Sequence, residues 1–240
     1  ESMVVVSTAS TGTTTGTLTL DVQDNVNGDV TVMVQVSDGN GGLDSTEFTL
    51  TITEVNDTPV ANTGSFSTDE DIDGSYTLTG DDGDPWDSSA DDQELTFSIV
   101  DSVSHGTVSL NSTTGALDYD PDDNYNGLDS FTFTVTDDGT TNGFSDALAS
   151  SQATVTITVN AVNDNPILTA ISSQTTPEDT DITVNLSGSD VDIATNGQSL
   201  SFTAESDDES MVVVSTVSTG TSTGTLTLDV QDNVNGDVTV

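Results

Sequence analysis

Apolar residues alternate with Thr, Ser and Asp along much of the chain. Val30, Val32, Val34 and Val36 are separated by single polar residues. The same period of two recurs at 18–22, 48–52, 95–99, 131–135, 155–159 and 182–186. Successive side chains of a strand point to opposite faces, so this period predicts strands with one buried and one exposed face. Clusters of Gly, Asn and Asp separate these stretches, and no amphipathic helix is predicted.

The density of these strands indicates the fold class. About seven short strands per ~100 residues, divided by turn residues, are typical of a Greek-key sandwich of the immunoglobulin type. At 240 residues, the chain has room for about two such domains. We therefore expect an all-β protein of tandem β-sandwiches in an extended array.

An internal repeat relates the two ends of the chain. Residues 1–32 recur as 209–240, an offset of 208, and 30 of the 32 positions are identical. We expect residues 1–55 to be the C-terminal part of one domain and 163–240 the N-terminal part of its next copy. Residues 56–162 are expected to form a complete domain. The segment 25–28 is echoed at 124–127, which indicates that the two kinds of domain are diverged copies of one fold.

The charge of the chain limits its functions. It has 42 acidic residues, no Lys, no Arg and one His, a formal net charge of −42. Self-repulsion of this size opposes a compact state, and bound divalent cations are the simplest source of countercharge. The composition excludes a basic surface for nucleic acid, a Walker lysine and an arginine finger. There is no Cys for disulfides or zinc, and no apolar run near the ~20 residues that span a bilayer.

Two similar segments are predicted to link the domains. Val55-Asn56-Asp57-Thr58-Pro59 returns as Val162-Asn163-Asp164-Asn165-Pro166. Proline has no N–H to donate and therefore ends a sheet. Asn and Asp place several oxygens close together, and oxygens are the ligands of calcium. Both segments are predicted to be linkers with bound metal.

Several motifs, in order and in duplicate, resemble those of cadherins. Glu54–Pro59 and Ala161–Pro166 resemble the acidic-x-Asn-Asp-Asn-x-Pro linkers of cadherin repeats. The other resemblances are an early glutamate segment (177–179 and 69–71), an Asp-x-Asp motif (190–192 and 82–84) and a late Asp-x-Gly-x-Asn motif (38–40 and 137–139). Together they are similar to bacterial cadherin-like tandem repeats of large secreted or surface adhesins and matrix proteins.

The resemblance implies Ca²⁺ at each joint between domains. For the joint at 55–59 it implies the ligands Glu54, Asn56, Asp57, Asp82, Asp84 and Asp138. For the joint at 162–166 it implies Glu70, Asn163, Asp164, Asp190 and Asp192. Asp38, Asn40 and Glu178 occupy equivalent motif positions in other copies. The alternative is that these acidic clusters are only the solvated surface of a salt-adapted protein.

Other readings concern single residues. The lone histidine, His105, and the carboxylate pair Asp118 and Asp120 suggest enzymatic chemistry on paper, but neither is part of a recognisable catalytic arrangement. Trp86 in the acidic 80–92 loop is a candidate sugar platform, which would make the chain a glycan- or protein-binding adhesion module.

The expected function is structural. We expect a non-enzymatic, calcium-rigidified segment of an extracellular adhesin, fibre or matrix protein that acts as a spacer or building block. Its expected partners are neighbouring copies of the same repeat, joined end to end or by strand complementation, and glycans or cell surfaces. Neither nucleic acid binding nor membrane insertion is expected.

Overall fold

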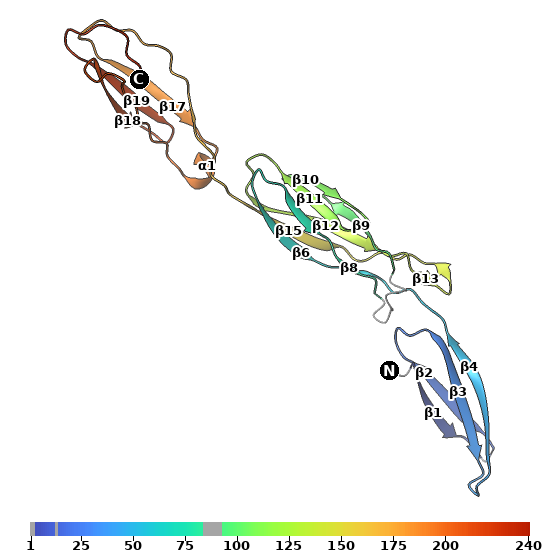
Figure 1. Ribbon diagram of the computed structural model, residues 1–240. Helices are drawn as coiled ribbons and strands as arrows, with labels where there is room; N and C mark the ends of the chain where they lie inside the picture. Colours follow the sequence, from blue (N-terminus) through green and yellow to red (C-terminus); the bar gives the residue numbers. More distant parts are fainter. Residues whose placement is uncertain (1–2, 13, 84–92) are drawn as a thin grey trace. The chain divides into compact units, whose positions relative to one another are not determined.

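The computed structural model describes residues 3–12, 14–83 and 93–240 (Figure 1). It divides into two compact units, Glu1–Ala161 and Val162–Val240. Strands dominate both units, which confirms the all-β sandwich class. The described residues contain one helical turn, α1 (Ile193–Asn196), which ends at Gly197 with a φ of 65°. This single turn is too short to have a 3.6-residue hydrophobic period, so it does not conflict with the prediction of no amphipathic helix.

Residues 56–161 form a sandwich of two main sheets. One sheet has the order β10-β11-β7 and the other β6-β15-β12-β9. These strands are β6 (Gly64–Asp69), β7 (Gly74–Thr77), β9 (Thr96–Asp101), β10 (Gly106–Leu110), β11 (Ala116–Pro121), β12 (Gly127–Thr136) and β15 (Ala153–Asn160). β6 pairs with β15 in parallel, and the other pairs in these two sheets are antiparallel. Two short pairs complete the unit, β5 (Val60–Ala61) with β8 (Gly80–Asp81) and β13 (Thr140–Thr141) with β14 (Phe144–Ser145).

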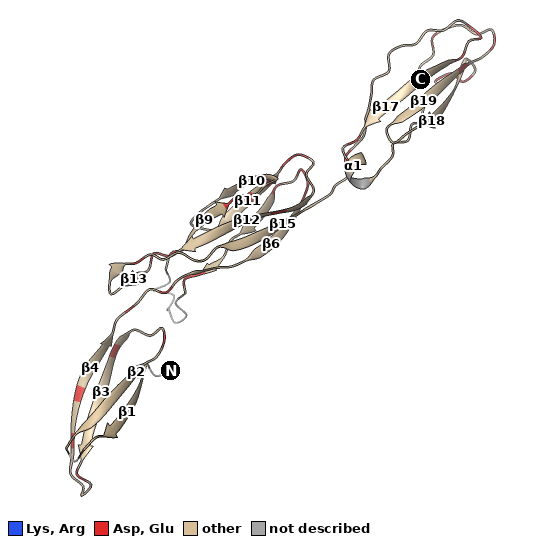
Figure 2. Ribbon diagram, turned by 180° about the vertical axis from the view of Figure 1, so that it is seen from behind, with Lys and Arg blue, Asp and Glu red and all other residues tan. Residues whose placement is uncertain are grey.

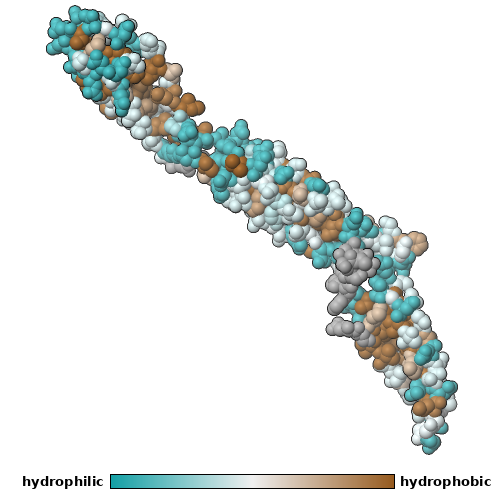
Figure 3. Space-filling view, in the orientation of Figure 1, coloured by the Kyte–Doolittle hydropathy of each residue, from teal (hydrophilic) through white to brown (hydrophobic). Residues whose placement is uncertain are grey.

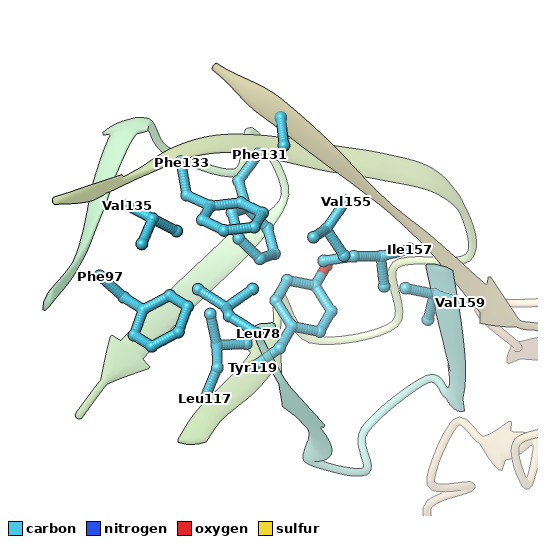
Figure 4. Packing of buried hydrophobic residues seen from close by; sticks show 11 residues of the cluster. Leu78, Phe97, Leu117, Tyr119, Phe131, Phe133, Val135, Val155, Ile157 and Val159 are labelled. Atoms are coloured by element: carbon cyan, nitrogen blue, oxygen red, sulfur yellow. The ribbon is translucent and has the colours of Figure 1, made fainter. Parts of the chain in front are cut away.

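The core of this sandwich comes from the alternating positions that the sequence pattern identified. Along β12 and β15, every second side chain is buried. Phe131 and Phe133 from β12 meet Leu117 and Tyr119 from β11 in one cluster (Figure 4). The same cluster contains Leu78, Phe97, Val135, Ala153, Val155, Ile157 and Val159. Thr and Ser occupy most of the intervening positions on the outer face, and Leu128 and Asn160 occupy the others.

Asp129 is a buried carboxylate at the edge of this core, with 7% of its surface exposed. Its oxygens accept hydrogen bonds from the backbone N–H groups of Ser104, His105 and Ser130 and from the Tyr119 hydroxyl, over 2.8 to 3.2 Å. Burial alone would raise the pKa of Asp129. The four donors outweigh burial and hold the pKa below its ordinary value of 3.8.

Residues 162–240 form a second β unit with one main sheet in the order β16-β17-β19-β18. Its strands are β16 (Ile167–Leu168), β17 (Ile182–Ser189), β18 (Val212–Ser218) and β19 (Thr223–Val230). The order β17-β19-β18 matches β7-β11-β10 of the other sandwich. Leu186 and Leu226 are buried between these strands, and most other apolar side chains of the unit are only half-buried.

Residues 4–52 form two separate antiparallel hairpins. β1 (Val4–Ser10) pairs with β2 (Gly16–Val22), and β3 (Gly28–Ser37) pairs with β4 (Leu43–Ile52). β3 and β12 are both ten residues long and begin at a glycine with positive φ, Gly28 at 119° and Gly127 at 140°. A side chain would be strained there. The two strands are therefore equivalent elements of the repeated fold.

A recurring turn contact supports the echo between the two kinds of domain. Asp71 accepts a hydrogen bond from the Asn124 N–H over 2.8 Å, and Asp179 accepts one from the Asn233 N–H over 2.8 Å. All four residues have positive φ values between 56° and 60°. Asn and Asp tolerate this left-handed conformation better than other non-glycine residues.

The Asp129 network predicts a large effect of a small substitution. Asp129→Asn should lower the free energy of unfolding by about 2–3 kcal/mol at pH 7, because the amide retains one acceptor oxygen and points hydrogens at N–H donors. The pKa of Asp129 is lower in the folded chain than in the unfolded chain. Its carboxylate therefore contributes its full stabilisation above the unfolded-state pKa. This contribution is lost as the pH falls through the folded-state pKa.

Urea unfolding of both proteins at pH 7 and pH 3 measures this effect. The difference between wild type and variant should shrink at pH 3. Asp118→Asn, which removes an exposed carboxylate from β11, is the control and should change stability by less than about 0.5 kcal/mol. Equal losses of unfolding free energy in Asp129→Asn and Asp118→Asn would contradict the stabilising role of the buried Asp129 carboxylate.

Candidate metal centre

Asn56 of the first linker is anchored inside residues 56–161. It is 5% exposed. Its side-chain nitrogen donates to Asp137 Oδ1 over 3.0 Å and to the Asp146 carbonyl over 2.8 Å, and its side-chain oxygen accepts from Gln93 Nε2 over 2.9 Å. Gly139 lies against the Asn56 amide, where a β-carbon would collide with it. The linker residue is thus a fixed structural element.

Asp137 is the buried carboxylate of this centre, with 3% of its surface exposed. Besides Asn56, the N–H groups of Gly139 and Leu148 donate to Oδ1 over 3.2 and 2.9 Å. The second oxygen, Oδ2, is buried and has no hydrogen-bond partner among the described residues. A buried carboxylate oxygen without a donor or cation is costly, so this atom is the first place to expect a bound cation.

Several of the predicted ligands lie near Asn56 and Asp137. Asp138 Oδ1 accepts from the Glu94 N–H over 2.7 Å, and Asp82 Oδ2 accepts from the Gln93 N–H over 3.4 Å. Glu54 Oε2 accepts from the Thr140 hydroxyl over 3.0 Å. Asp57 is half-buried in the linker, and Asp84 lies outside the described residues. The sequence prediction assigned the late motif to Asp138, whereas the buried carboxylate is its neighbour Asp137.

The second linker has a similar arrangement. The Asp164 N–H donates to Asp192 Oδ2 over 2.7 Å, and Asp192 is 2% exposed. Asp190 Oδ1 accepts from the Asp192 N–H over 2.9 Å. Asn163 is exposed, and its side-chain oxygen accepts from Gln198 Nε2 over 2.8 Å. Four of the residues predicted for this joint therefore lie together in residues 162–240.

A glutamine at each linker was missed by the sequence analysis. Gln93 donates to Asn56, and Gln198 donates in the same way to Asn163. A signal was present in the sequence, because Gln93-Glu-Leu-Thr-Phe and Gln198-Ser-Leu-Ser-Phe share one pattern. Each glutamine orients the linker amide, so it is a positioning residue.

The remaining predicted ligands lie in other places. Glu70 is buried and accepts from Asn126 Nδ2 over 3.2 Å, in the unit Glu1–Ala161. Glu178 is exposed. Asp38 and Asn40 form the turn between β3 and β4, where Asp38 Oδ1 accepts from the Asn40 and Gly42 N–H groups. These two hydrogen bonds outweigh slight burial and lower the pKa of Asp38. The role of all these residues as ligands stays a prediction.

The donor set fits a hard cation in its chemistry. Calcium takes six to eight oxygens from carboxylates, amide side chains and carbonyls, and the Asp137 region supplies all three types. Among the described residues, no three Asp, Glu or His side chains converge closely enough to form a metal-holding cluster by themselves. A calcium site here would therefore need amide or carbonyl oxygens beside its carboxylates.

The residues considered for catalysis or sugar binding either have a structural role, face solvent or lie outside the residues that the structure describes. The His105 ring stacks on Tyr125, with 4.1 Å between centroids and 6° between planes. Asp118 and Asp120 share the exposed face of β11. Trp86 and residues 84–92 of the acidic loop lie outside the described residues, so the ligand-binding reading stays a prediction.

Comparison with known families identifies one domain. The bacterial cadherin-like domain family matches residues 56–161, which confirms the resemblance and identifies this segment as a cadherin-like domain. Domains of this kind are adhesion or structural modules. No curated protein matches the chain. Within the described residues, no helix is long and apolar enough to cross a membrane.

Solved structures share the fold at low sequence identity. The extracellular cadherin domains 1–4 of protocadherin gamma B7 are 17% identical with a TM-score of 0.51, over 97% of this chain and 57% of that one. The EC3–6 cis-dimer structure of protocadherin gammaB7 is 16% identical with a TM-score of 0.55, over 97% and 59%. Domains 3–6 of protocadherin gamma B2 are 14% identical with a TM-score of 0.51. The chain thus spans less than two thirds of these structures, and the likeness shows the fold alone.

The different burial of the two linker asparagines yields a matched prediction. Asn56→Ala should lower the unfolding free energy by about 2–3 kcal/mol, because it removes two donated hydrogen bonds and leaves the buried Asp137 with one donor fewer. Asn163→Ala, at the equivalent exposed position, should cost less than about 0.5 kcal/mol. Calorimetric melting of the 240-residue chain compares them. Equal losses would contradict the anchoring role of Asn56.

Proposed function

We propose that the chain is a calcium-rigidified repeat segment of an extracellular adhesin, fibre or matrix protein. The observation that carries the proposal is Asp137 Oδ2, a buried carboxylate oxygen with no donor among the described residues of a chain without Lys or Arg. A divalent cation is the countercharge that this chemistry demands. The cadherin-like match of residues 56–161 supports the same reading.

Two sets of residues would hold the ion. At the first linker these are Asn56, Asp57, Asp82, Asp84, Asp137 and Asp138, with Glu54 beside them. At the second linker they are Asn163, Asp164, Asp190 and Asp192. Gln93 and Gln198 would orient the linker amides toward the ion. Bound calcium would replace repulsion between carboxylates with shared coordination and so stiffen each linker.

The biological role that follows is mechanical. Calcium is abundant outside cells, so a chain that depends on it is suited to a secreted or cell-surface location. A spacer needs length and stiffness, and nearly identical copies 208 residues apart supply both. The partners would be neighbouring copies of the repeat. No catalytic function is proposed, since His105 and the β11 carboxylates serve the fold or face solvent.

Calorimetric titration with CaCl₂ tests the metal assignment. The wild-type chain should bind calcium, and Asp137→Asn should weaken the tightest site at least tenfold, because the amide removes one negative charge from the buried position. Asp118→Asn removes one exposed carboxylate and is the matched control for net charge. It should leave the affinity within about twofold.

Three results would overturn the metal assignment. They are no heat of binding at millimolar calcium, equal effects of the two substitutions, and binding that disappears at 0.15 M NaCl. The last result would indicate a diffuse counterion atmosphere, which salt screens, rather than coordination. Small-angle scattering with calcium and then with chelator tests the stiffening, and unchanged flexibility would contradict the spacer role.

A further inference from the structure

Two equivalent strand pairs of the repeated fold are closed by loops of different length. β3 and β4 are joined by residues 38–42, whereas β12 and β15 are joined by the much longer loop 137–152. The short loop closes on itself, because the Asp38 N–H donates to the Gly42 carbonyl and Asp38 Oδ1 accepts from the N–H groups of Asn40 and Gly42. The strand pair therefore does not need the longer loop, whose extra residues serve another purpose.

The longer loop contains a small hairpin. β13 pairs with β14 across the turn Asn142-Gly143, and both turn residues have positive φ, 53° and 74°, as in the type I′ turn of tight hairpins. The Asp146 N–H donates to the Gly139 carbonyl over 2.9 Å and closes the base of the hairpin. Figure 1 shows the hairpin, at the label β13, apart from the two main sheets. Its shape is thus fixed by its own turn and pairing.

The hairpin holds the first linker at Glu54. The Asn142 N–H donates to the Glu54 carbonyl over 3.1 Å, and the Thr140 hydroxyl donates to Glu54 Oε2 over 3.0 Å. β4 ends at Ile52, so Thr53 alone separates the last paired residue of β4 from Glu54. The covalent connection between β4 and the held segment is therefore a single residue.

The hairpin also holds the linker at Asn56. The Asn56 N–H donates to the Thr141 hydroxyl oxygen over 3.0 Å, and the same hydroxyl donates to Asp146 Oδ2 over 2.7 Å. The Asn56 side-chain nitrogen donates to the Asp146 carbonyl over 2.8 Å. Thr141 lies in β13 and Asp146 directly follows β14. The Thr141 hydroxyl therefore joins the linker to both sides of the hairpin.

Apolar packing contributes little to this contact. Phe144, the only apolar residue of β13 and β14, is 77% exposed, and Val55 of the linker is 62% exposed. Figure 3 shows pale brown, apolar colour at the outer edge of the chain where this hairpin lies. Hydrogen bonds therefore hold the hairpin and the linker together. Their donors are N–H groups and hydroxyls, so none of them requires a bound cation.

We propose that residues 139–146 are a clamp that keeps the segment 54–56 attached to the sandwich in the absence of calcium and presets Glu54 and Asn56 for the ion. Thr140 and Thr141 are then positioning residues, which act through Glu54 and Asn56. The presetting rests on the proposed function, because it concerns the same calcium site, whereas the clamp itself does not. A segment that is already ordered loses less conformational entropy on binding, so the ion binds more tightly.

Hydrogen exchange of the 240-residue chain in excess chelator tests the clamp. The Asn56 amide should exchange slowly, since its N–H is bonded to Thr141. Thr141→Val removes the hydroxyl at nearly constant volume and should speed the exchange of the Asn56 amide about tenfold. Thr154→Val removes an exposed hydroxyl from β15 and is the matched control. It should leave the Asn56 rate within about twofold.

The amides of β12 and β15 separate the clamp from general stability. They should keep their wild-type rates in Thr141→Val, because the clamp opens locally. Three results would overturn the clamp. They are a wild-type Asn56 amide that exchanges in chelator as fast as in an unfolded chain, equal Asn56 rates in Thr141→Val and Thr154→Val, and equal acceleration of Asn56 and of the β12 and β15 amides in Thr141→Val.

A matched pair of glycines tests the hairpin without removing any group that touches the linker. Gly143 and Gly41 have φ values of 74° and 103°, and both have open space where a β-carbon would lie. Valine strains the backbone at both positions. Gly143→Val should speed Asn56 exchange in chelator about tenfold, because it distorts the hairpin turn. Gly41→Val, in the loop 38–42, should not, and equal Asn56 rates in the two variants would overturn the role of the hairpin.

Calorimetric titration with CaCl₂ tests the presetting. Thr141→Val leaves every proposed ligand in place but should weaken the tightest site about tenfold, whereas Thr154→Val should leave the affinity within about twofold. Equal affinities of wild type and Thr141→Val would overturn the presetting. A wild type that binds no calcium would overturn the presetting together with the proposed function, while exchange in chelator still decides the clamp. The clamp and the calcium assignment can therefore fail separately.

Discussion

Every carboxylate of this chain must be satisfied without a lysine or an arginine. Figure 2 shows acidic residues on the ribbon and no basic ones. The fold meets this constraint by turning backbone N–H groups and hydroxyls toward carboxylates, as at Asp129, Asp38 and Asp71. Asp137 Oδ1 is satisfied in the same way, but its Oδ2 is buried with no donor among the described residues. The constraint that shapes the turns therefore also points to where a cation is needed.

The repeat gives the second organising fact. The hairpin of residues 4–22 returns in residues 212–230 with the same strand register, and there it also pairs with β17. The repeated sequence therefore forms the same local structure in both places.

Much of the fold could be predicted from the sequence, and less of the site. The period of two located β2, β3, β4, β12, β15 and β17, because half-buried strands leave that pattern directly. The helical turn α1 leaves no such pattern, and the ligand roles of the acidic residues stay a prediction. Asp137 is buried and the adjacent Asp138 is exposed, a difference that two neighbouring acidic residues do not show in the sequence. Gln93 and Gln198 were missed because their role appears only when the linker folds back onto each domain.

The most direct test of the account compares coordination with screening. Thermal unfolding of the 240-residue chain is followed in CaCl₂ and in NaCl at equal ionic strength. If calcium fills specific sites of the folded chain, a concentration of 100 times the dissociation constant should add about 2.7 kcal/mol per site, well above the effect of NaCl. If the two salts stabilise the chain equally, the acidic residues only need screening, and the account of calcium-held linkers is wrong.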